Sequence, residues 1–90
     1  MKLTDRIFEL TESKVRELGY ELYDVEYQKE YDNWVLTLYI DSKDGISLDD
    51  CEIVSNAVDP ILDEADPIEQ AYYLSVSSPG IESPPQKKKK

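Results

Sequence analysis

Two stretches of alternating polar and apolar residues, separated only by a polar turn at 30–33, constrain the fold most. The first stretch, 20–29, places three apolar side chains on one face: Tyr23, Val25 and Tyr27. The second, 34–41, places four on one face: Trp34, Leu36, Leu38 and Ile40. A period of two is typical of strands, so the sequence predicts a β-hairpin. Because Val35 and Tyr39 make the other face partly apolar, we expect the second strand to lie inside the sheet.

A helix is predicted before this hairpin. Its apolar residues recur at roughly helical spacing: Leu3, Ile7, Leu10, Val15 and Leu18. Thr4 is the predicted N-cap residue, since its hydroxyl can accept a hydrogen bond from a free backbone N–H. Gly19 follows where a helix commonly ends in a left-handed residue.

A second helix is predicted after the Asp44-Gly45 turn. Ser47 and Asp50 have the spacing of a capping box, and the residues that follow form an apolar stripe: Cys51, Val54, Val58, Ile61 and Leu62. Pro60 interrupts this pattern, because proline lacks the N–H that a helix interior requires. We therefore expect a kink or a restart of the helix at Asp59.

A third strand is predicted at 71–77, followed by a turn at Ser78-Pro79-Gly80. The order α-β-β-α-β indicates an α+β fold, a three-stranded sheet with two helices packed on one face. Residues 83–90, rich in proline and lysine, have no apolar pattern and are expected to be a disordered tail. The predicted core comprises Ile7, Leu10, Leu18, Leu38, Val54, Val58 and Leu74.

Composition narrows the function classes. Twenty acidic residues oppose ten basic ones, and since four of the ten are 87–90, residues 1–86 carry a net charge of 6 − 20 = −14. Such a body repels nucleic-acid phosphate and attracts basic partners. There is no secretory or membrane-spanning segment, so we expect a cytoplasmic protein.

Catalysis, metals and cofactors are not expected. The chain has one cysteine, Cys51, and no histidine, so neither a zinc site nor a base for a thiol nucleophile can be assembled. Paired carboxylates such as Asp49-Asp50 lie at predicted helix ends, where water solvates them. The segment around 41–45 faintly resembles a twelve-residue calcium-binding loop, in which Gly45 would be the conserved glycine at position six. The first and twelfth positions, which require carboxylates, would then be Ile40 and Cys51, so the motif fails.

An RNA-binding domain is the alternative. Its surface tyrosines could stack on bases, and the lysines at 87–90 could contact phosphates. However, the three glycines do not provide the GXXG loop of KH domains, which share a similar order of elements. Strand aromatics are also more often packed than free.

Six short segments, taken in order, resemble the N-terminal domain of the RimP family of ribosome maturation factors, over about residues 3–82. They are Leu18–Leu22, Asp24–Tyr27, Ile40-Asp41, Leu48–Cys51, Asp66–Ile68 and Ser77–Ile81. The resemblance implies a domain at 1–82 that assists maturation of the small ribosomal subunit. Its implied partners are the subunit and a basic small-subunit ribosomal protein, with weak rRNA contact, and we expect a monomer.

The expected partner-binding residues are Asp49 and Asp50 at the start of the second helix, and Ser77, Ser78, Pro79 and Gly80 after the third strand. Both segments would present exposed groups on a rigid scaffold. The sequence departs from the family after this turn: Ser83 stands where the family has arginine, and the family's second, SH3-like domain is expected to be absent.

Overall fold

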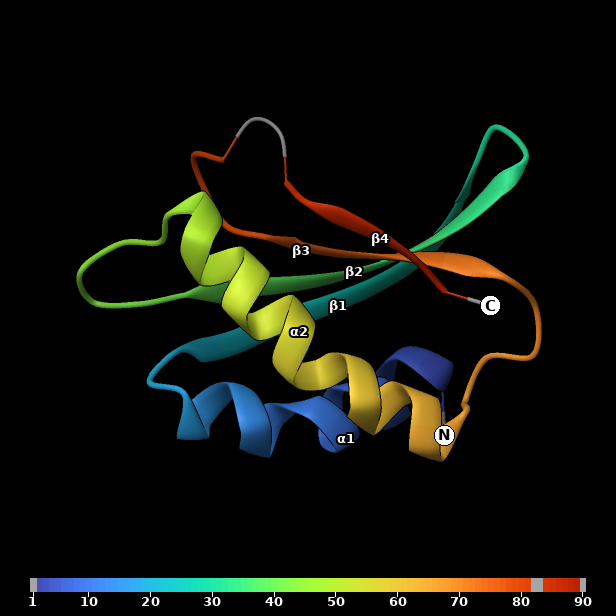
Figure 1. The fold of residues 1–90 in the computed structure, drawn as a ribbon, viewed down its shortest axis with the longest axis horizontal. Coiled ribbons are helices and arrows are strands. Elements are labelled where there is room, and N and C mark those ends of the chain that lie inside the picture. Colours follow the sequence, from blue (N-terminus) through green and yellow to red (C-terminus); the bar gives the residue numbers. More distant parts are fainter. Residues whose placement is uncertain (1, 82–83, 90) are drawn as a thin grey trace.

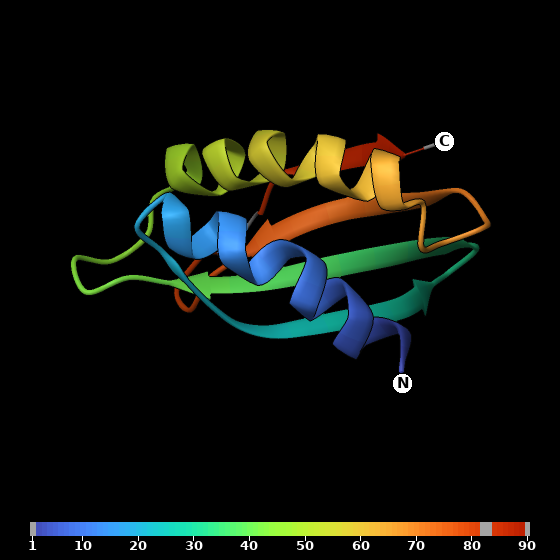
Figure 2. The same cartoon turned by 90° about the horizontal axis from the view of Figure 1, so that it is seen from below.

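The computed structural model describes residues 2–81 and 84–89, in which two helices cover one face of a four-stranded mixed sheet (Figures 1 and 2). The elements are α1 (Leu3–Glu17), β1 (Glu21–Glu30), β2 (Asn33–Asp41), α2 (Leu48–Ala65), β3 (Tyr72–Ser77) and β4 (Gln86–Lys89). The predicted α+β class with both helices on one face is confirmed. The predicted strand number is wrong, because β4 adds a fourth strand.

The strand order is β1-β2-β3-β4. β1 pairs with β2 in antiparallel register, β2 pairs with β3 in parallel, and β3 pairs with β4 in antiparallel register. A parallel pair needs a long crossover connection, which α2 supplies between β2 and β3. The prediction that the strand at 34–41 lies inside the sheet is confirmed.

The predicted end of α1 is correct, whereas its predicted start is not. Leu18 is the C-cap, and Gly19 adopts φ +95°, with its N–H donating to the Arg16 carbonyl and that of Tyr20 to the Val15 carbonyl. These two bonds form a Schellman motif. At the start, Lys2 is the N-cap residue and makes no side-chain capping bond. Thr4 therefore lies inside the first turn, where its hydroxyl cannot cap the helix.

α2 begins as predicted, with both bonds of the capping box between Ser47 and Asp50. A kink or a restart was predicted at Asp59; the restart is wrong, since the helix runs continuously through Pro60 to Ala65. A mid-helix proline costs about 3 kcal/mol. Burial of Val58 and Leu62 on either side holds the turn in place and offsets this cost.

β1 contains a bulge that the alternating pattern does not predict. Leu22 pairs with Ile40 and Asp24 with Tyr39, so Tyr23 is an additional residue on this strand. As a result Leu22 and Val25 are both buried, although they are three residues apart, and Tyr23 is 46% exposed. The prediction that Tyr23 shares a face with Val25 and Tyr27 is therefore wrong.

The core lies between the sheet and the helices. Five predicted core residues are completely buried: Ile7, Leu38, Val54, Val58 and Leu74. The other two predictions are wrong, since Leu10 is only partly buried and Leu18 is 36% exposed. Thr11 occupies the buried stripe of α1 instead, and its hydroxyl donates to the Ile7 carbonyl at 2.8 Å, which satisfies the hydroxyl away from water.

The predicted disorder of 83–90 is wrong for Gln86–Lys89, which form β4. The apolar pattern could not predict this strand, because its pairing with β3 uses backbone groups and no apolar side chain. Residues 83 and 90, also assigned to the tail, lie outside the described residues.

Candidate functional site

The first predicted segment, at the start of α2, contains one exposed carboxylate and one that is held by hydrogen bonds. Asp49 is exposed in the first turn. Asp50 accepts hydrogen bonds from the Ser47 N–H at 2.9 Å, the Ser47 hydroxyl at 3.0 Å and the Tyr20 hydroxyl at 2.7 Å. These bonds, led by that from the Ser47 backbone, lower the pKa of Asp50. Asp50 thus fixes the helix start, and Asp49 is free to face a partner.

A pH-dependent stability follows for Asp50→Asn. Because the pKa of Asp50 is lowered in the folded state, its carboxylate stabilises the fold above its ordinary pKa of about 3.9, and this contribution is lost as pH falls through the folded-state value. The parent should therefore exceed Asp50→Asn in unfolding free energy near neutral pH, and the gap should narrow by about pH 3. Urea midpoints at the two pH values measure this.

Asp49→Asn is the matched control, since it removes a neighbouring exposed charge without disturbing the capping box. It should lower the unfolding free energy less than Asp50→Asn near neutral pH. A gap between parent and Asp50→Asn that stays constant from neutral to acid pH would show that the carboxylate charge does not stabilise the helix start.

The second predicted segment, Ser77–Gly80, is a turn at the end of β3. Ser78 is buried, and its carbonyl accepts a hydrogen bond from the Ile81 N–H at 3.1 Å. Pro79 and Gly80 are exposed, and Gly80 adopts φ +87°, which favours glycine. The tip of this turn is therefore its most accessible part, and Ser77 is half-buried.

The structure brings the two predicted segments to the same end of the molecule, together with the loop that joins α1 to β1 (Figures 1 and 2). The Tyr20–Asp50 hydrogen bond ties that loop to α2. Two apolar side chains are also exposed at these element ends, Leu18 at 36% and Leu48 at 53%. Neither exposure was predicted from the sequence, since the helical spacing places Leu18 in the core and Leu48 lies outside the predicted apolar stripe of the second helix.

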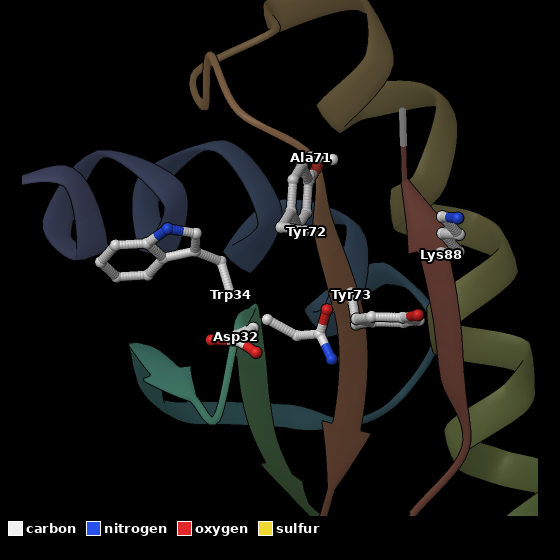
Figure 3. Close-up of a pocket in the computed structure, with 7 residues that line it drawn as sticks. Asp32, Trp34, Ala71, Tyr72, Tyr73 and Lys88 are labelled. Atoms are coloured by element: carbon white, nitrogen blue, oxygen red, sulfur yellow. The ribbon is translucent and has the colours of Figure 1, made fainter.

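A pocket lies at the opposite end of the sheet, beside the turn between β1 and β2 (Figures 1 and 3). It has a volume of about 240 Å³ and is lined by Asp32, Asn33, Trp34, Ala71, Tyr72, Tyr73 and Lys88. The rings of Trp34 and Tyr73 point in different directions, and Trp34 stacks on Tyr27 with ring centroids 4.7 Å apart. The two charged residues of the pocket, Asp32 and Lys88, form no ion pair with each other in the described contacts.

The basic strand β4 contacts an acidic stretch of α2. The Lys87 ammonium lies 3.0 Å from an Asp59 carboxylate oxygen and donates to the Asn56 side-chain oxygen at 3.0 Å. Lys89 forms ion pairs with Asp59 and, at 2.5 Å, with Asp63. The Lys89 side chain is only 7% exposed, and this burial lowers its pKa. This cluster was not predicted from the sequence, although Asp59 and Asp63 have the i, i+4 spacing that places two side chains on one face of a helix.

Among residues 2–81 and 84–89, no group of three or more metal-ligating side chains converges on a point where it could hold an ion. Over the same residues, neither helix has the length and apolar character that a membrane span requires.

The family model of the RimP N-terminal domain matches this chain over residues 10–82. The matched region includes the start of α2, β3 and the turn after it, and it stops before β4.

Proposed function

The chain belongs to the RimP N-terminal domain family, whose proteins are ribosome maturation factors, and we propose that it assists maturation of the small ribosomal subunit by binding a basic ribosomal protein or the subunit surface. The family match, which covers most of the chain, is the observation that carries this proposal. The charge of −14 over residues 1–86 supports it, because an acidic body attracts basic ribosomal proteins. We propose that the chain works in the cytoplasm as a monomer.

We propose that the contact surface is the end of the molecule formed by Asp49 and the tip of the turn at Pro79-Gly80. Asp49 lies on a helix start that the capping box holds in place, and its exposed carboxylate remains available to a partner. The exposed Leu18 and Leu48 add apolar area beside it, as in many protein interfaces. Asp50 fixes the helix start that carries Asp49, and the Ser78 carbonyl accepts the Ile81 N–H bond that closes the turn.

Charge reversal at Asp49 tests the surface. We expect Asp49→Lys to weaken association with free small subunits by roughly three- to tenfold at low salt, and to reduce the salt dependence of binding, because one attractive charge becomes repulsive. Co-sedimentation with purified small and large subunits over a salt series measures both effects.

Asp32→Lys is the matched control, since it makes the same charge change at the exposed hairpin turn, at the other end of the sheet. It should bind nearly as the parent does. If Asp49→Lys folds and binds as tightly as the parent, the contact surface lies elsewhere. If the parent itself does not prefer small subunits to large ones, the proposed function is wrong.

The alternative, an autonomous RNA-binding domain, receives less support from the contacts of its aromatic residues. Tyr72 is buried, Tyr27 is stacked on Trp34, and the Tyr39 hydroxyl donates to Glu26 at 2.9 Å. Two of the lysines proposed to contact phosphate are paired with carboxylates of α2. RNA would have to displace these contacts, and the negative charge of residues 1–86 repels its phosphates.

A further inference from the structure

The strand β4 is unusual because it contains no apolar residue. Its four residues are glutamine and three lysines. Hydrophobic burial, the main force behind most strand docking, is therefore limited to the methylene stems of its lysines, chiefly that of the buried Lys89. What remains is backbone pairing to the edge of β3 and the ion pairs of Lys87 and Lys89 with α2. Backbone pairing is independent of side-chain identity, so an extended segment from another chain can make the same bonds.

The ion pairs give this edge a preference for lysine at alternate positions. In β4, Lys87 and Lys89 stand opposite Leu74 and Tyr72 on the helix side of the sheet, and Lys88 is exposed. Two residues of a strand span about 6.7 Å. Asp59 and Asp63 are four residues apart on α2, which is about 6 Å along a helix. The two spacings agree, so each lysine of a Lys-X-Lys segment meets a carboxylate.

The two elements that β4 contacts, β3 and α2, are held in place by the core and not by β4. Leu74, Val76 and Tyr72 of β3 are buried against the core, and Asp59 is fixed on α2 between the buried Val58 and Leu62. The family match contains β3, Asp59 and Asp63 but not β4. The site thus belongs to the domain, and the strand that fills it lies outside the matched region.

From these observations we propose that the edge of β3 and the acidic side of α2 form a binding site for an extended segment of a basic protein with lysines at alternate positions, and that β4 occupies this site as an internal competitor. The inference rests on the proposed function in one respect: it gives the basic ribosomal partner a place to dock. Binding would add the segment to the sheet in place of β4.

The test displaces β4 from the site by substitution and adds a free peptide that can take its place. The probe is a fluorescent peptide with the sequence of residues 84–90, added to the full chain and to the variant Lys87→Glu/Lys89→Glu, in which the carboxylates of α2 repel β4. We expect the peptide to bind the variant at least about tenfold more tightly than the parent, because the internal strand no longer competes. Fluorescence anisotropy measures the affinity, and circular dichroism checks the fold. Lys88→Pro, which disturbs the strand backbone and keeps both lysines that face α2, is a second opening variant.

Two controls separate strand addition from adsorption of a basic peptide. Alternate residues of an edge strand direct their N–H groups toward the sheet. Of two peptides N-methylated at alternate residues, one should therefore bind and the other should not. Adding Asp59→Asn/Asp63→Asn to the opened variant should abolish binding, whereas Asp32→Asn/Asp44→Asn, an equal charge change at exposed positions, should preserve it.

Equal binding of both N-methylated peptides, or no binding to either opened variant, would overturn the proposed site. So would an opened variant that dimerises and excludes the peptide, since a second copy would then be the occupant. If the peptide binds but the chain does not prefer small subunits to large ones, only the proposed function is refuted. If the chain prefers small subunits but the peptide does not bind, only this site is refuted.

Discussion

Replacing Leu38 by alanine should lower the free energy of unfolding by about 2–5 kcal/mol. Leu38 is completely buried in β2, where it stands between Val25 of β1 and Val76 of β3. Neighbours on both sides are fixed by strand pairing, so the structure cannot collapse into the vacated space. Small domains have a total stability of about 5–15 kcal/mol, so this single truncation removes a large share of it.

Urea unfolding of the parent and Leu38→Ala measures the loss. The control is Ile53→Ala, which truncates an aliphatic side chain that is 48% exposed on α2 and should change the unfolding free energy by about 0.5 kcal/mol or less. Similar losses for the two variants would show that Leu38 does not lie in the core.

Cys51 should react with a thiol reagent at least about a thousandfold more slowly in the native protein than in the unfolded chain. Its side chain is completely buried, and burial, with a smaller effect of the Asp50 charge, raises the pKa of the thiol. The attacking species is the thiolate, so both effects reduce the rate. The Cys51 N–H donates to the Ser47 carbonyl, so it is not one of the free N–H groups of the helix start that would stabilise a thiolate.

Absorbance of the released reagent, with and without urea, gives the two rates. The variant Cys51→Ala/Ile53→Cys moves the thiol to an exposed position on the same helix, and it should be labelled quickly without urea. Rapid stoichiometric labelling of the native parent would instead place Cys51 at an accessible surface.

The sequence predicted those parts of the fold that depend on local chemistry. The Gly19 stop, the Ser47 capping box and the central position of β2 are each encoded within a few residues, and the structure confirms them. The bulge at Tyr23 was not predictable, because an extra residue reverses the phase of the alternation without any change of composition. Leu18 looked like a core residue because helical spacing alone cannot show where a helix leaves the sheet.

The candidate site was predictable only in part. The start of α2 and the turn at Ser77–Gly80 were selected because such segments expose groups on a rigid scaffold and because they belong to the family motifs, and the structure places them at one end of the molecule (Figure 1). The hydrogen bond from the Tyr20 hydroxyl to Asp50 joins residues thirty positions apart, so it depends on tertiary structure and could not be predicted from local sequence. The docking of β4 is tertiary too, since the lysines form a strand only because β3 and the carboxylates of α2 meet beside them.

The placement of β4 also bears on solubility. Without it, β3, with its buried Tyr72, Leu74 and Val76, would form the edge of the sheet, and an apolar edge strand invites aggregation. With β4 outermost, two copies that approach through this edge bring lysines against lysines and repel each other. The opposite edge, β1, is interrupted by its bulge, which disrupts regular pairing with an incoming strand. Growth of the sheet into fibres is thus opposed at one edge by charge and at the other by backbone irregularity.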